Sequence, residues 1–163
     1  MKKLVIPCLL LACIGFQSCK KEESKKEVET TQAATEKPVS VQCYEATYEK
    51  DIVDLKLNTL KNGKITGNMV MKVAGAPEKN GVISGEFHGD TLFADYTFIE
   101  GTNKTRTFKN PMAFLKKDTQ LILGNGTMQT TMGVTYLVKD KPIDFERVKY
   151  KFAAVECSDE TQK

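Results

Sequence analysis

The 163-residue chain carries few side chains that could do acid, base or nucleophilic chemistry together. Its single histidine, His88, lies beside an expected hairpin turn, and one imidazole there cannot complete a Ser or Cys triad. Asp51 with Asp54, and Asp90 with Asp95, are the carboxylate pairs that the spacing offers. They flank turns or point away from the expected apolar face, whereas glycosidase carboxylates need a cleft. We therefore expect a protein that is not an enzyme.

The remaining charged residues are better explained as surface pairs than as a site. Glu86, Asp95 and Arg106 fall on one face of neighbouring expected strands, where an ion-pair ladder contributes little stability. One His and widely spaced Cys residues argue against a metal site. The glycines lack the spacing of a phosphate-binding loop. No metal and no non-covalent cofactor are expected.

The first residues have the pattern of a secretory leader. Met1-Lys2-Lys3 is basic and Leu4 to Phe16 is apolar, as in a signal peptide. This run is too short for a spanning helix, which needs about 20 apolar residues. Removing the leader leaves 22 of the 24 basic residues against 21 acidic ones, a formal charge of +1. Nucleic-acid-binding proteins usually carry a stripe of basic residues, whereas the net charge here is close to zero. No nucleic acid is therefore expected as a partner.

Ser18-Cys19 at the end of this run resembles a bacterial lipobox. The resemblance implies that residues 1–18 are a lipoprotein signal peptide and that Cys19 becomes a lipid-bearing N-terminus. It places the protein at the bacterial outer membrane, with the covalent lipid as anchor. Phe16 stands where a lipobox usually has Leu. Lipidation at Cys13 and an ordinary signal peptide remain alternatives.

Residues 19–42 are expected to be a disordered tether, because they hold hardly any large apolar side chain. Lys20-Lys21-Glu22-Glu23 resembles the charged signal that exports some lipoproteins to the cell surface. A solvated linker start explains the same residues equally well. Whether the domain faces the periplasm or the cell surface therefore stays open.

Cys43 and Cys157 are the two cysteines left in the mature domain. They stand at its first and last residues, in a compartment that permits disulfides. We predict that they are bonded and join the ends of a domain spanning residues 43–157, with 158–163 as a disordered tail. Two free thiols, as metal ligands, are the alternative.

Between these cysteines the apolar residues alternate with polar ones, which is the period of β-strands. Val53, Leu55 and Leu57 alternate with Asp54 and Lys56. The same period continues through segments that begin at Ile65, Ile83, Leu92, Met112, Leu121, Thr127 and Tyr150. Residues 139–147 show no clear pattern and are expected to form a loop or one helical turn after Pro142.

Turn residues separate these segments. Asn62-Gly63 predicts a type I′ hairpin turn, Gly89-Asp90 a second tight turn, and Gly124-Asn125-Gly126 a third hairpin. Pro111 marks an edge or a bulge. A short repeat, in which Asn-Gly is followed by an apolar residue and then by a second Gly, occurs at residues 62–67 and again at residues 80–85. In each copy the second glycine, Gly67 or Gly85, falls on the inward face of the expected strand. Inward glycines on adjacent strands favour a strongly curved sheet, although shared turn chemistry alone could explain the repeat.

These features predict an all-β domain, a small antiparallel up-and-down barrel of about eight or nine strands. A β-sandwich is the alternative. From the Cys-Tyr start at Cys43 through residues 89–96 to Cys157, the chain resembles uncharacterised bacterial lipoproteins with small lipocalin-like or calycin-like barrels. That resemblance covers roughly 115 residues and implies the fold alone.

Two functions fit such a barrel. In the first, it binds a small apolar or amphipathic ligand, and the lining residues expected are Met69, Met71, Tyr96, Phe98 and Phe152. In the second, the barrel is filled and its outside contacts another envelope protein, as inhibitor-type lipoproteins do. Methionines suit adaptable pockets, but they also fill irregular cores. Asp90-Thr91-Leu92 matches a short O-glycosylation sequon, which makes Thr91 a candidate acceptor.

Overall fold

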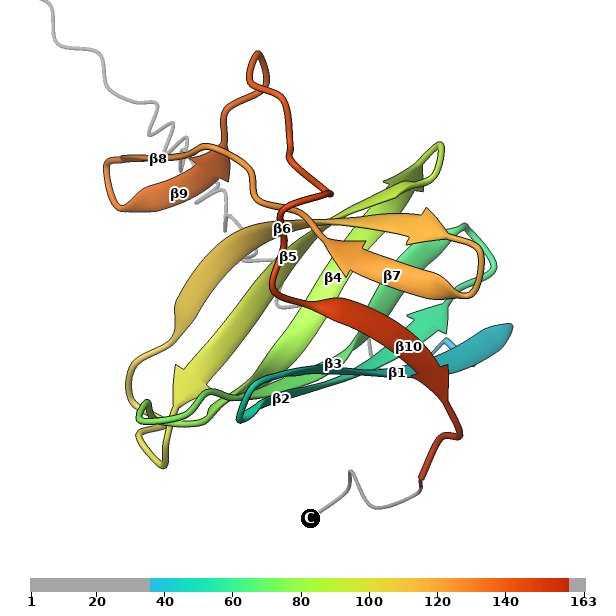
Figure 1. Cartoon of the computed structure of the whole chain (residues 1–163), viewed down its shortest axis with the longest axis horizontal. Helices are drawn as coiled ribbons and strands as arrows, with labels where there is room; N and C mark the ends of the chain where they lie inside the picture. Colours follow the sequence, from blue (N-terminus) through green and yellow to red (C-terminus); the bar gives the residue numbers. More distant parts are fainter. Residues whose placement is uncertain (1–35, 159–163) are drawn as a thin grey trace, which may run out of the picture. The chain divides into compact units, whose positions relative to one another are not determined.

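A computed structural model describes residues 36–158, and this part contains strands and no helix. Eight antiparallel strands close a barrel in the order β1-β10-β7-β6-β5-β4-β3-β2, and β8 pairs with β9 outside it (Figure 1). The strands are β1 (Ser40–Tyr48), β2 (Asp51–Thr59), β3 (Lys64–Lys72), β4 (Lys79–His88), β5 (Thr91–Glu100), β6 (Phe108–Lys117), β7 (Gln120–Leu123), β8 (Met128–Thr131), β9 (Val134–Leu137) and β10 (Lys151–Val155).

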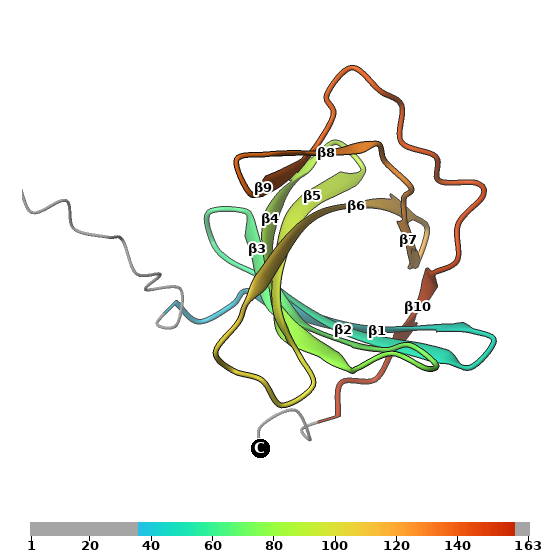
Figure 2. The same cartoon turned by 90° about the vertical axis from the view of Figure 1, so that its left-hand side faces the viewer.

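The predicted up-and-down barrel is therefore confirmed, and the β-sandwich is excluded. Each strand from β1 to β6 pairs with the next one along the chain, and β10 closes the ring between β7 and β1 (Figure 2). The closing seam is short. β1 pairs with β2 along its full length, from Ser40–Thr59 to Tyr48–Asp51, but meets β10 only between Cys43 and Glu45.

Several predictions concern residues that lie outside the described part of the chain. They are the signal peptide 1–18, lipidation at Cys19, most of the tether and the tail beyond residue 158. At the tether's end the structure differs from the expected boundary, because β1 begins at Ser40. The Val39 amide also donates to the Thr59 carbonyl, so pairing with β2 extends the strand ahead of Cys43.

The barrel interior follows the predicted alternation. Asp51, Val53, Leu55 and Leu57 of β2 are buried, while the residues between them are exposed or half-buried. The same period on the other strands brings one large apolar cluster together inside the barrel. Its members are Tyr44, Ala46, Val53, Leu55, Leu57, Ile65, Met69, Ile83, Leu92, Ala94, Tyr96, Phe98, Phe114, Leu121 and Phe152.

Two glycines on the inward face show why the sheet can close. A Cβ atom on Gly67 would overlap the backbone carbonyl of Lys56, and one on Gly85 would overlap the carbonyl of Phe93. Neighbouring backbones thus approach so closely that no side chain fits, as in a strongly bent strand. The close approach of neighbouring strands predicted at these glycines is confirmed, and their part in the curvature of the sheet stays a prediction.

The turns agree with prediction in place but not always in type. Gly89, with φ 60°, forms the predicted two-residue turn between β4 and β5. The Asn62-Gly63 turn is present, but type I′ is wrong, because it requires positive φ at both residues and only Gly63 (φ 80°) has it. The Gly63 amide donates to the Leu60 carbonyl instead, which makes a longer loop.

The predicted hairpin at Gly124-Asn125-Gly126 is wrong. β7 ends at Leu123, and its antiparallel partner β6 precedes it across a turn at Asp118-Thr119. At Gly124 the chain leaves the barrel, forms the β8–β9 hairpin around Met132-Gly133, and returns only at β10. Figure 2 shows this excursion on the outside of the ring, next to β6 and β7. Residues 139–147 contain no helical turn.

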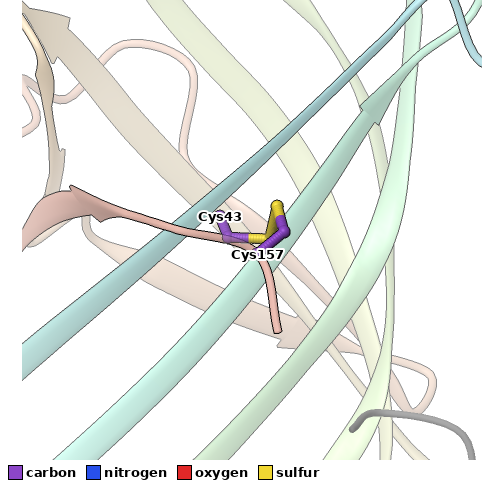
Figure 3. Close-up of a disulfide and its surroundings, with 2 residues drawn as sticks. All are labelled: Cys43 and Cys157. Carbon is purple, nitrogen blue, oxygen red and sulfur yellow. A yellow bond between two sulfur atoms is a disulfide. The ribbon is translucent and has the colours of Figure 1, made fainter. Parts of the chain in front are cut away.

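The predicted disulfide is confirmed. Cys43 of β1 and Cys157, just beyond β10, are bonded across 114 positions of sequence (Figure 3). The bond lies at the short seam between β1 and β10, where the first and last strands meet. It therefore reinforces one of the two short seams through which β10 closes the ring.

Candidate functional site

A pocket of about 250 Å³ lies in the barrel wall where β6 and β7 part. We call it the wall pocket. Most of its lining is apolar, and the lining comes from β6, the end of β7, the β8–β9 hairpin and the approach to β10. The lining residues are Pro111, Met112, Ala113, Leu123, Gly124, Asn125, Gly126, Met128, Leu137, Lys149 and Tyr150.

The wall opens there because β7 is too short to cover β6. β6 runs from Phe108 to Lys117, but its pairing with β7 begins only at Phe114. The first half of β6 is therefore paired on one side only, with β5. Pro111 lies in this half, which agrees with its predicted edge position, since proline has no N–H to donate to a further strand.

The excursion after β7 covers the outside of this opening. Gly124 leaves room for Ile143 and Phe145, and Gly126 leaves room for Leu137, because a Cβ atom on either glycine would press against these side chains. Asn125 and Asp144 exchange backbone hydrogen bonds of 2.8 and 3.0 Å. The covering segment is thus both packed and hydrogen-bonded onto the end of β7.

Asp144 holds the return segment in shape. Its Oδ1 accepts from the amides of Glu146 and Arg147 at 2.8 and 3.0 Å, and its Oδ2 accepts from Arg147 Nε at 2.8 Å. These hydrogen bonds, from the Arg147 amide first, lower the pKa of the Asp144 carboxyl. The segment is therefore organised by an ionised carboxylate.

On its inner side the wall pocket reaches the barrel core. Met112, Leu123 and Tyr150 line it and also pack against the core cluster. Tyr150 donates its hydroxyl to Asp51 Oδ2 at 2.8 Å, and the amide of Ala74 donates to Asp51 Oδ1 at 2.9 Å. Asp51 flanks the turn before β2, as expected, but its side chain is 8% exposed and lies on the inward face, where these two donors satisfy it.

This pair shifts both pKa values. The Ala74 amide, the Tyr150 hydroxyl and the charge of Lys149 lower the pKa of Asp51. Burial and the hydrogen bond to Asp51 raise the pKa of Tyr150 to about 12. At neutral pH, Asp51 is thus a carboxylate and Tyr150 a neutral donor already committed to it. Neither group is free to move a proton to or from a ligand.

The five residues predicted to line a ligand occupy a different place. Met69, Tyr96 and Phe152 are 0% exposed and Phe98 is 4% exposed, while Met71 is half-buried against the same core. None of the five lines the wall pocket. Their role in ligand binding stays a prediction.

Aromatic contacts fill this part of the interior. The rings of Tyr96 and Phe98 stack at 4.7 Å between centroids, and Phe98 stacks on Phe108 at 5.5 Å. The Tyr96 hydroxyl lies 3.0 Å from the Met69 carbonyl oxygen and 2.9 Å from that of Lys79. Burial raises the pKa of Tyr96 well above its ordinary value. Tyr96 therefore serves as a neutral bridge between β5, β3 and β4.

The other candidate residues lie on the surface. His88 is exposed, as expected, and its Nε2 is 2.9 Å from Glu86 Oε1. Asp95 pairs with Lys109 at 2.9 Å. The ladder expected from Glu86, Asp95 and Arg106 is wrong, because Arg106 lies in the loop before β6 and stacks over the Phe108 ring. Thr91 begins β5, half-buried, and its glycosylation stays a prediction.

The residues of the wall pocket were not recognised in the sequence. The glycines flanking Asn125 were interpreted as a turn, although paired small residues also indicate that another segment packs closely. Lys149 and Tyr150 follow the stretch with the least periodicity. Only the pairing of β10 with β7 brings these two residues to the wall pocket.

The described residues, 36–158, contain neither a metal-ligand cluster nor a membrane-spanning helix. No group of three or more His, Cys, Asp or Glu side chains could hold a metal ion there. No helix in that range is long and apolar enough to cross a membrane. Comparisons with protein-family models, with curated proteins and with solved structures gave no match, so the geometry of the barrel and its wall pocket is the basis for a functional proposal.

Proposed function

We propose that this chain is a non-catalytic, lipid-anchored protein of the bacterial outer membrane whose barrel binds a small apolar or amphipathic molecule. The observation that carries the binding proposal is the wall pocket, a largely apolar space of about 250 Å³ that opens beside the core. Ligand sites are typically concave and mostly apolar, with a few polar groups for orientation. The wall pocket has this character.

Its size favours a small ligand. Sites for drug-sized molecules usually measure roughly 300–1,000 Å³, and the wall pocket lies just below that range. Met112 and Leu123 at its inner side adjoin the core cluster. Flexible Met side chains at the inner and outer walls, Met112 and Met128, can adapt to a guest. The five interior residues proposed from the sequence lie in the core beyond them.

The polar groups favour binding over catalysis. Tyr150 has its hydroxyl committed to Asp51 and a pKa of about 12. Lys149 is the one formally charged side chain among the residues known to line the wall pocket. An acid–base mechanism needs groups that exchange protons near the operating pH.

Filling the wall pocket should weaken binding. In Met128→Trp, a larger side chain enters from the hairpin, where position 128 is 51% exposed and tolerant of change. We expect the affinity for octanol, measured by calorimetry on the domain lacking its lipid, to fall about tenfold or more, equivalent to about 1.4 kcal/mol. Native mass spectrometry of the wild-type domain, after incubation with an extract of the bacterial envelope, would identify the natural ligand.

The matched control is Met132→Trp at the hairpin tip, where Met132 is 99% exposed and does not line the wall pocket. Its affinity should equal that of the wild type. Failure of the wild-type domain to retain any small molecule, from extract or as octanol, would overturn the binding proposal.

Anchoring has its own test. Cys19→Ala should move the protein from the membrane to the soluble fraction, because the acyl chains that hold it would be missing. Cys13→Ala is the matched control and should stay at the membrane with the mass of a lipidated protein. Cell fractionation and intact mass measure both. Membrane retention of Cys19→Ala, or release of Cys13→Ala, contradicts lipidation at Cys19.

A second candidate, contact with another envelope protein, is favoured by the hairpin. Met132 is 99% exposed, Val134 64% and Tyr136 40%, and apolar residues gathered on a protruding element often mark an interaction site. The stacked rings of Tyr96, Phe98 and Phe108 inside the barrel agree with this candidate as well. It becomes the preferred function if the wild-type domain retains no small molecule, and cross-linking from position 132 in cells then identifies the protein it touches.

A further inference from the structure

The known lining of the wall pocket contains one charged residue. Ten of its eleven known lining residues carry no formal charge at neutral pH, and the remaining one is Lys149. Lys149 lies next to Tyr150, just before β10. A ligand seated against Met112, Leu123 and Leu137 would therefore meet Lys149 as the one charged side chain among the known lining residues.

The Lys149 ammonium is not neutralised by an ion pair within the part of the chain that the structure describes. Its Nζ lies over the ring of Tyr48, 5.3 Å from the ring centroid, at the rim of the barrel. A cation over an aromatic face keeps its charge and its capacity to donate hydrogen bonds. Lys149 is thus positioned at the rim without an anionic partner in direct contact.

Asp51 is an acidic group close enough for its carboxyl pKa to be lowered by the charge of Lys149. It is 8% exposed, and its two oxygens already accept hydrogen bonds from Ala74 and Tyr150. Asp51 therefore weakens the positive potential at Lys149 without occupying its donors. We therefore expect Lys149 to attract an anionic ligand, but less strongly than it would without the nearby Asp51 carboxylate.

We propose that the wall pocket selects an amphiphile with an anionic head, the head against Lys149 and the alkyl chain against Met112, Leu123 and Leu137. This inference rests on the binding function proposed above and specifies its ligand class. Carboxylate and phosphate heads share the chemistry that Lys149 recognises.

The attraction comes from one partly exposed charge pair. Exposed ion pairs contribute little and hydrogen bonds to charged groups contribute more, so the preference for an anionic head over a neutral one of equal chain length should be about 3- to 10-fold. Because salt screens exposed charges, this preference should shrink as ionic strength rises. Binding of the neutral analogue should not change in the same way.

The test compares four probes with the same chain, namely octanoate, octyl phosphate, octylamine and octanol, by calorimetry on the complete domain with its disulfide intact. The wild type should bind octanoate or octyl phosphate more tightly than octanol, and octylamine most weakly. The difference between octanoate and octyl phosphate identifies the preferred head group. Lys149→Met should remove the anionic preference, so that octanoate and octanol bind with about equal affinity, and Lys149→Glu should favour octylamine.

Lys151→Met is the matched control, since Lys151 is an exposed lysine of β10 that does not line the wall pocket. It should keep the wild-type preference, and thermal unfolding should show that all three variants fold. Equal affinity for octanol and octanoate, unchanged in Lys149→Met, would overturn the anionic inference while the binding proposal stands. Failure of all four probes to bind would overturn both.

Discussion

Replacing Cys43 and Cys157 together by alanine is expected to lower the free energy of unfolding by about 4 to 5 kcal/mol in the chain-entropy treatment of cross-links. The bond spans 114 positions, so its loss frees nearly the whole domain in the unfolded state. The seam that it closes is also short, with β1 and β10 paired only from Cys43 to Glu45. The loss should therefore be large for a domain of this size.

Denaturant unfolding of the wild type and the double variant measures this effect. The oxidised and reduced wild type provide a second comparison in which no side chain is removed, and the two differences should agree. A change below about 1 kcal/mol in both comparisons would contradict the expectation, because the chain-entropy treatment assigns about 4 to 5 kcal/mol to so long a loop.

Phe152→Ala is expected to lower the free energy of unfolding by about 3 to 5 kcal/mol. Phe152 is 0% exposed, and its ring meets that of Phe114 edge to face at 5.8 Å. It is also the one buried residue of β10, whose other four residues are exposed. Truncation would leave a cavity and remove the side chain that holds the closing strand in the core.

Phe93→Ala is the matched control for this change. Phe93 lies on β5 and is 40% exposed, and its loss should alter stability by about 0.5 kcal/mol or less. Equal losses in the two variants, measured by the same denaturant titration, would show that burial in the barrel does not govern the effect. When Phe152→Ala is combined with loss of the disulfide, the change in the free energy of unfolding should differ from the sum of the two separate changes, because both features hold β10 in place.

Local patterns predicted most of the barrel. The alternation of Val53, Leu55 and Leu57 with charged residues identified the inward face of β2 correctly. The spacing of Gly67 and Gly85 indicated where neighbouring backbones come close. These features are readable because a strand's side chains alternate strictly between its two faces, and because glycine marks a place where a Cβ atom cannot fit.

Turn chemistry was less informative. The turn at Asp118-Thr119 joins β6 to β7 with no glycine, and Asp118 itself adopts the left-handed conformation (φ 54°). It therefore lacked the signal that Asn62-Gly63 and Gly89-Asp90 provide. Gly124-Asn125-Gly126 carries that signal, yet its glycines serve to admit Ile143, Phe145 and Leu137. A turn-like sequence does not show which strands its flanks will pair with.

The strand periods, the inward glycines and the two cysteines that bond across the seam could be predicted from the amino-acid sequence. The strand periods and the glycines can be recognised from neighbouring residues in the chain. The cysteines can be paired because they are the two that remain in the mature domain. The tertiary structure alone decided the wall pocket and the burial of Asp51. Both depend on pairing between segments far apart in the chain, such as β6, the return segment before β10 and the start of β2. Alternation tells which side of a strand is buried, but it does not tell which strands become neighbours or where the wall between them is left open.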